Sequence, residues 1–354
     1  MVKIFWNLIP PTAKELDRVE KRLKRLTVLG PAADQTGTAF LLAPTGKQLA
    51  VRPSFIARPD TDPAVGDFSD RGLPDRSQRP PSTRLISPRG IALRFYLTAL
   101  FVAQSRSDGE RPSNLLPLND PDEPVSWVDL VATAAVRATG TRTSISVRDK
   151  KLRQVHEALA RLAHPSVDLV ELPNAAKPVG TYEGFLLKQE RGSRYHDTDE
   201  PNETYRIPSP RTASLVRLPA GLFLNGWIHV LEDSELAMVL MVALLHAKYG
   251  SGRPVYVDGD TRLRHYGLSR DTYMTHATLE RFGLLEVEPD EARDFLRPGK
   301  VTGYKDGDPP PKLHRFRLLP DGFEQPAATT VIEALQERSD AGLRAARVSG
   351  AASA

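Results

Sequence analysis

Residues 260–289 read DTRLRHYGLSRDTYMTHATLERFGLLEVEP: a short basic segment, a tight turn and a helix that runs into a strand. Gly267 supplies the turn, and Ser269 is a preferred N-cap for the second helix. Residues 284–288 and 313–319 then predict two strands that pair as a hairpin. We therefore expect two helices joined by a turn, followed by a strand pair, in this half of the chain.

An earlier stretch follows the same order. Residues 146–173, SVRDKKLRQVHEALARLAHPSVDLVELP, contain a Ser-capped basic helix and a strand, and YEGFLLKQE at residues 182–190 supplies a second strand. Apolar helices are expected ahead of both stretches, from about residue 87 and from residue 233. This is the element order of a winged helix-turn-helix, in which one helix enters a DNA groove. The sequence predicts two such domains in tandem, and DNA binding as their function.

Length and composition agree with two tandem winged helix-turn-helix domains in an α+β, mainly helical chain. The chain has 354 residues, more than one hydrophobic core usually serves, and 40% of them are hydrophobic. The expected division is an N-terminal amphipathic helix and Pro-rich linker at 1–85, winged-helix domains at 86–190 and 216–326, a linker at 191–215, and a C-terminal helix and tail at 327–354.

The N-terminal region is expected to be partly disordered. Residues 12–29 carry apolar residues at helical spacing with Lys and Arg between them. They predict an amphipathic helix that either lies on DNA or docks on a partner or another domain. Residues 30–84 are rich in Pro, Asp and Arg and predict a mobile linker, in which TAFLLA (38–43) and LAVRPSFIA (49–57) could form short strands.

Basic charge is concentrated on the first Ser-capped helix. The net charge of the chain is +4, and residues 142–161 hold six Lys or Arg against two carboxylates. The apolar residues of this helix share one face, which is expected to leave Arg148, Lys151 and Gln154 largely on other faces. The residues expected to contact DNA in the two domains are Arg142, Arg148, Lys150, Lys151, Arg153, Gln154, Arg262, Arg264, Ser269, Arg270, Thr272, Tyr273 and His276.

Motifs for catalysis or metal binding have less support in the sequence than the pattern that predicts DNA binding. A phosphate-cradling loop and an HExxH motif are both missing. We interpret the Asp-Gly-Asp sequence at 258–260 as a turn and helix cap, and HRFR at 314–317 as a strand. His156 and His276 are interpreted as histidines on helix surfaces. Because there is no cysteine, disulfides and thiolate metal sites are excluded. We expect no enzyme activity, no cofactor and no metal.

A membrane location is not expected. The longest apolar run, residues 236–245, is too short to span a bilayer. Residues 1–11 lack the length and the cleavage site of a signal peptide. The sequence therefore predicts a soluble protein of the cytoplasm.

The order of elements from residue 87 to residue 326 resembles that of the tandem winged-helix replication initiators of plasmids. The resemblance implies that two domains on one chain grip successive grooves of an origin repeat. It also implies recognition-helix residues in both domains, namely Arg148, Lys151, Arg153, Arg270, Thr272, Tyr273 and His276. The long region 1–84 departs from the compact initiators.

Three functions remain open from the sequence. The first is a non-catalytic initiator that binds duplex DNA, and the second is a transcriptional regulator with the same domains. The third, an enzyme of nucleic-acid processing, lacks a convincing cluster of acidic residues. Double-stranded DNA is the expected partner, and a second copy of the chain or the replication or transcription machinery are further candidates.

Overall fold

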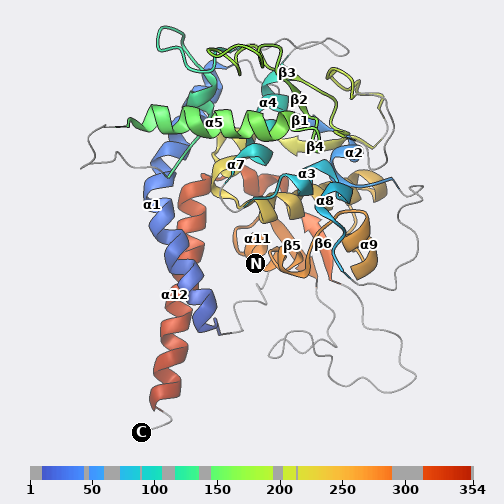
Figure 1. Cartoon of the computed structure of the whole chain (residues 1–354). Helices are drawn as coiled ribbons and strands as arrows, with labels where there is room; N and C mark the ends of the chain where they lie inside the picture. The colour runs from blue at the N-terminus through green and yellow to red at the C-terminus, as the bar shows by residue number, and fades with distance from the viewer. Residues whose placement is uncertain are drawn as a thin grey trace.

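The computed structural model of the chain is α+β and about half helical, with small two-stranded sheets (Figure 1). It describes residues 10–43, 48–59, 72–87, 90–105, 116–134, 145–193, 202–212, 214–288 and 314–351, the last seven of these for their backbone alone. The expected α+β, mainly helical class is confirmed at this level. Within the described ranges, every helix is too short or too polar to cross a lipid bilayer.

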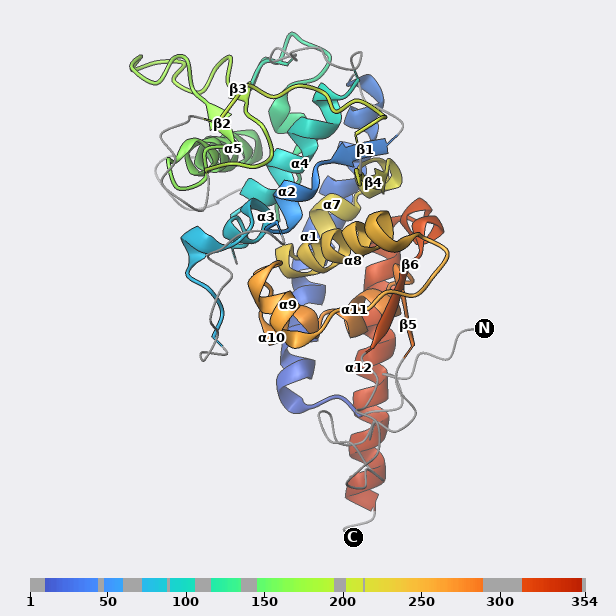
Figure 2. The ribbon, with the colours of Figure 1, turned by 90° about the vertical axis from the view of Figure 1, so that its right-hand side faces the viewer.

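The two ends of the chain meet in one helix pair. Helix α1 (Ala13–Leu42) runs antiparallel to α12 (Ala327–Ala351), and the pair extends below the rest of the fold in Figures 1 and 2. Gly342 of α12 lies against the side chain of Leu16, near the start of α1. The helices expected at residues 12–29 and in the C-terminal region are confirmed, and α1 is longer than expected.

The linker predicted for residues 30–84 is wrong for residues 30–42, which belong to α1. The buried face of α1 continues past Gly30-Pro31 through Ala33 and Phe40. The packing of this face compensates for Pro31, which normally interrupts a helix because it lacks a backbone N–H. TAFLLA is therefore helical and not a strand.

The next segment of the expected linker is part of a sheet. Strand β1 (Gln48–Val51) pairs antiparallel with β4 (Val216–Pro219), and Leu49 stands opposite Leu218. The strand predicted in LAVRPSFIA is right for its first residues, and α2 (Pro53–Ile56) follows it. This sheet joins the N-terminal region to the first residues of the expected second domain.

The first of the two expected repeats, here called the first unit, contains a helix, a short 3₁₀ helix, a second helix and a hairpin. Its elements are α4 (Ala92–Ala103), η4 (Trp127–Leu130), α5 (Val147–Ala163), β2 (Val170–Glu171) and β3 (Leu186–Leu187). The two strands pair antiparallel. Helix α5 packs on α4 and η4. The order predicted from the sequence, helices followed by a pair of strands, is present.

The second unit is preceded by two short helices and ends before α12. These are α6 (Gly221–Leu224) and α7 (Trp227–Val230), which lie between β4 and α8 in the chain. The elements of the second unit are α8 (Asp233–Tyr249), α9 (Gly259–Arg264), α10 (Arg270–Tyr273), α11 (His276–Arg281), β5 (Leu285–Glu288) and β6 (Arg315–Leu318). A 3₁₀ helix, η5 (Pro320–Glu324), leads into α12.

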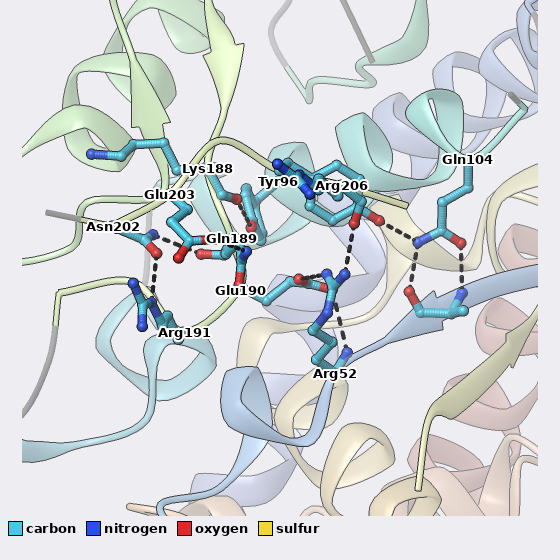
Figure 3. Close-up of polar contacts among 12 residues, drawn as sticks. Arg52, Tyr96, Gln104, Lys188, Gln189, Glu190, Arg191, Asn202, Glu203 and Arg206 are labelled. Atoms are coloured by element: carbon cyan, nitrogen blue, oxygen red, sulfur yellow. Dashed lines mark hydrogen bonds and ion pairs between the residues drawn. The ribbon is translucent and has the colours of Figure 1, made fainter. Parts of the chain in front are cut away.

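The buried side chains of both units, of α1 and of α12 form one continuous hydrophobic cluster. A buried polar junction lies where the N-terminal strand meets the first unit (Figure 3). There Gln104, just after α4, donates to the carbonyl of Ala50 at 2.6 Å and to the hydroxyl of Tyr205 at 2.8 Å. Arg52 forms an ion pair with Glu190, whose side chain is fully buried. Burial raises the pKa of the Glu190 carboxyl even though Arg52 lies beside it.

The segment predicted as an interdomain linker, residues 191–215, is partly built into this core. Tyr205 is fully buried. Asn202 donates to the carbonyl of Asp168 at 2.8 Å, and to that of Gln189, also at 2.8 Å, beside which it lies in Figure 3. The linker interpretation is therefore wrong for residues 202–207, because Asn202 bonds to backbone next to the β2–β3 hairpin and Tyr205 accepts from Gln104 just after α4. Residues 194–201 lie outside the described part of the chain.

Candidate nucleic-acid interface

The turn of the second unit is shaped by a helix cap and a glycine. Asp258 caps α9: its carboxylate accepts the amide hydrogen of Thr261 at 2.8 Å and the hydroxyl hydrogen at 2.6 Å. This confirms the cap interpretation of the Asp-Gly-Asp sequence. Gly267 has φ +63°, and a Cβ there would lie 2.8 Å from the hydroxyl oxygen of Thr83. Both the backbone angle and this close approach favour glycine in the turn.

The helix after the turn is one helical segment with a tightened middle. The hydroxyl of Ser269 caps it by accepting the amide hydrogen of Thr272 at 3.1 Å, as expected. Met274 and Thr275 between α10 and α11 keep right-handed helical backbone angles, and the bonds there tighten locally to the i→i−3 pattern. We call α10 and α11 with this joint the recognition segment.

The outer face of the recognition segment is polar at its start. Arg270 and Asp271 are exposed, and 39% of Met274 is exposed. Thr272 is half-buried, and its hydroxyl lies 3.1 Å from that of Ser269. Of the residues expected to contact DNA in this segment, Arg270 is the one that the structure leaves fully at the surface.

The inner face of the recognition segment overturns the interpretation of His276 as a surface residue. The side chain of His276 is fully buried, its Nδ1 lies 2.6 Å from the carbonyl of Tyr273, and its ring lies 5.5 Å from that of Phe316. Burial lowers the pKa of His276 to about 3, so the imidazole is neutral at ordinary pH. Such a residue packs the helix onto the strands and is not available to phosphate.

Tyr273 and Arg262 also serve the scaffold of the turn. The guanidinium of Arg262 lies 5.3 Å from the ring centre of Tyr273 and donates to the carbonyl of Leu268 at 2.5 Å. Tyr273 in turn meets Phe316 edge to face at 5.6 Å. Arg264, the remaining basic residue expected on α9, is half-buried.

Three strand segments close the second unit. Strands β5 and β6 pair antiparallel, with Val287 opposite Phe316, and Val255 forms a bridge to Phe316 from the other side. Arg317 pairs with Glu286 across the hairpin at 2.8 Å. HRFR is thus mostly strand, as predicted. The loop between β5 and β6 lies outside the described residues.

In the first unit the apolar face of α5 is as predicted, but the basic face is not. Val155, Leu159 and Leu162 are buried. Arg148, however, points toward η4, where its guanidinium pairs with Asp129 at 2.7 Å and also donates to Asn119. The expectation that Arg148 lies on a free outer face is therefore wrong.

Lys151 and Gln154 share this inward orientation. Both are half-buried, the side-chain oxygen of Gln154 is buried, and burial lowers the pKa of Lys151. Lys150 is also half-buried, whereas Arg153 is exposed on the same side of α5 as Asp149 and Glu157. The exposed face of α5 is thus mixed in charge. Arg142 lies outside the described residues.

The described residues hold no group of three or more His, Cys, Asp or Glu placed to bind a metal ion. His156 is half-buried and stacks on Tyr182 with ring centres 4.5 Å apart. Burial lowers its pKa.

A basic groove that the sequence interpretation missed lies beside the recognition segment. It has a volume of about 740 Å³ and runs between α1 and the recognition segment, with α12 contributing at one side. Seven basic side chains and three carboxylates line it: Lys14, Arg18, Lys21, Arg22, Arg25, Arg281, Arg338, Glu15, Glu232 and Glu235. Four basic residues of α1, Lys14, Arg18, Lys21 and Arg25, follow one another at intervals of 4, 3 and 4 residues, a signal of one charged helix face.

Comparison with known proteins gives no assignment. No family model matches the chain, and neither the curated proteins nor the solved structures contain a significant match.

Proposed function

We propose that the chain binds double-stranded DNA through its second unit, and that this unit is a winged helix-turn-helix. The observation that supports the proposal is the order of elements from residue 233 to residue 318: α8, the strand segment at Val255, α9, the glycine turn, the recognition segment, and the β5–β6 pair. A winged helix-turn-helix has this order, and its second helix of the turn motif enters the major groove.

In this proposal the start of the recognition segment reads base edges. Arg270 stands in its first turn, where recognition helices contact bases, and its side chain is exposed. A guanidinium that bonds both acceptors of a guanine contributes about 1–3 kcal/mol of discrimination. Tyr273 and His276 act behind it by holding the segment on the strands.

The first unit is proposed as a second winged-helix domain that contributes less to recognition. Its helix, hairpin and capping box at Ser146 fit that fold. Its outer face offers Arg153 between carboxylates, so its contribution to affinity should be small. Tandem units support the role of a replication initiator that binds origin repeats, and a transcriptional regulator is the alternative.

The test is to select duplexes from a random library with the full chain, and then to measure affinity for the selected and a scrambled site. Arg270→Ala should lower affinity for the selected site by about 5–150-fold and leave the scrambled site nearly unchanged. Arg217→Ala is the matched control, because Arg217 is an exposed arginine of β4. Strand β4 lies above α8 in both ribbon views, whereas α9 and α11 lie below α8 (Figures 1 and 2).

Two results would separate or overturn these roles. Failure of the full chain to enrich any duplex would refute the DNA-binding proposal. If DNA is bound, directly repeated sites beside the gene would support the initiator, and sites in the promoters of other genes would favour the regulator.

A further inference from the structure

Helix α1 carries a stripe of positive charge next to the recognition segment. The stripe consists of Lys14, Arg18, Lys21 and Arg25, which follow one another at intervals of 4, 3 and 4 residues. All four line the groove described above. Lys14, Arg18 and Lys21 are exposed, and Arg25 is half-buried. At a rise of 1.5 Å per residue the stripe is about 16 Å long.

Two of the three carboxylates in the groove, Glu15 and Glu235, are already paired with arginine side chains. Glu15 pairs with Arg338 at 2.7 Å and with Arg281 at 3.4 Å. Burial opposes the ionisation of Glu15, but the hydrogen bond and charge of Arg338 outweigh it and hold the pKa of the carboxyl below its usual value. Glu235 forms a two-pronged pair with Arg22, at 2.6 and 2.8 Å. These two carboxylates therefore neutralise arginines at the base of the groove.

The stripe itself keeps most of its charge for a ligand. Lys21 pairs with Asp17 on the exposed surface, at 2.8 Å, a kind of pair that contributes little energy. Lys14, Arg18 and Arg25 form no ion pair with any carboxylate in the described part of the chain. Among the described residues, the seven basic side chains that line the groove outnumber its three carboxylates, so the groove carries an excess of positive charge.

The opposite wall of the groove belongs to the recognition segment. Met274 and Thr275 of the joint and Thr278 of α11 line the groove. Figure 2 shows α10 and α11 beside α1. The two walls are held at a set distance, because Arg22 of α1 lies 5.1 Å from the ring centre of Phe282 and is anchored to Glu235 at the start of α8. A preformed site of this kind costs little reorganisation when a ligand binds.

We propose that α1 is a second DNA-binding element, whose stripe holds the sugar-phosphate backbone of the strand that the recognition segment reads. The inference rests on the proposed DNA binding and deepens it. A phosphodiester backbone is a linear array of anions, and it matches a linear array of cations better than a compact anion does. Such contacts position the protein on the duplex and carry no sequence information.

The experiment compares Lys14→Gln, Arg18→Gln and the double variant with the unaltered chain, on the selected duplex and on a scrambled one, over a range of salt concentrations. Lys24→Gln is the matched control, because Lys24 is an exposed lysine of α1 that does not line the groove. All of these positions are exposed, so folding should be unaffected, and circular dichroism and thermal unfolding check this.

Each groove substitution should reduce the slope of log affinity against log salt by about 0.9, and the double variant by about 1.8. One lost counterion at 0.1 M salt corresponds to about an eightfold loss of affinity, the same on both duplexes. The control should match the unaltered chain.

The outcomes distinguish this inference from the proposed function. If the full chain binds DNA and Arg270→Ala weakens it, but the groove variants behave like Lys24→Gln, the role of α1 is overturned and the proposed function stands. A loss confined to the selected duplex would also overturn it, because it would indicate base reading by α1. If the full chain binds no duplex, both are refuted.

Discussion

Replacing Arg22 by methionine should destabilise the protein severely, because it removes one partner of a buried ion pair. The guanidinium of Arg22 meets the carboxylate of Glu235 at 2.6 and 2.8 Å, and the two side chains are 12% and 2% exposed. Methionine keeps most of the length and apolar surface of the arginine stem. The variant therefore leaves the Glu235 carboxylate buried without its cation, and it also removes the weaker bond of the guanidinium to the carbonyl of Val230.

The expected magnitude follows from burial. Removing one member of a buried pair typically costs about 3–5 kcal/mol, since the remaining charge is neither hydrated nor paired. An exposed pair is worth about 0–1 kcal/mol, so Lys21→Met on the same helix is the matched control, with 74% and 59% exposure for Lys21 and Asp17. Arg22→Met combined with Glu235→Gln should recover most of the loss, because no buried charge then remains unpaired.

The assay is equilibrium unfolding in urea, followed by tryptophan fluorescence. Trp227 is fully buried and lies 6.4 Å from Phe282, the ring on which Arg22 rests, so it reports on this region. A cost for Arg22→Met below about 1 kcal/mol, similar to that of Lys21→Met, would refute the reasoning. So would a double variant no more stable than Arg22→Met alone. In either case α1 would not be anchored to α8 through this pair.

Three further predictions concern pH, the turn and α5. Burial raises the pKa of Glu280 to about 7, so folding favours the protonated form of this carboxyl. The protein should therefore lose up to about 3 kcal/mol of stability as the pH rises from about 4.5 to 7. Urea titrations of Glu280→Gln over the same pH range should lack this loss. Gly267→Ala should lower the melting temperature more than Gly283→Ala. Both glycines have positive φ, but of the two only Gly267 has neighbours that an added Cβ would meet. Equal shifts in melting temperature would contradict the idea that these neighbours require glycine. Arg148→Ala should leave the affinity for duplex DNA within about twofold, because Asp129 already pairs with the Arg148 guanidinium. A loss of about 1–3 kcal/mol of discrimination at one base pair would instead show that Arg148 reads DNA.

The parts of the fold that could be predicted from the sequence depend on local chemistry. Ser146 and Ser269 cap helices where the residue type and the following pattern indicated a helix start. Gly267 takes the positive φ that its place between two helices suggested. Caps and turns are decided by bonds within three or four residues, so a short stretch of sequence contains all the information they need.

The candidate site could be predicted only in part, because burial depends on residues far away in the chain. The spacing of apolar residues on α5 predicted its buried face correctly, but not that Arg148 would turn toward Asp129. His276 resembles a surface residue in its polar surroundings, yet Phe316, 40 positions later, covers it. The charged stripe of α1 was visible as a spacing, but its place beside the recognition segment was not.

The sequence alone determined the fold class and much of the order of elements: a mainly helical α+β chain in which two stretches of helices, each followed by a strand pair, come one after the other. Tertiary structure decided how they are joined. The pairing of β1 with β4, the packing of α1 along α12 and the burial of Tyr205 turn the expected linkers into parts of one core. The physical reason is that periodicity and capping act over a few residues, whereas the burial of apolar surface is a property of whichever distant segments come into contact.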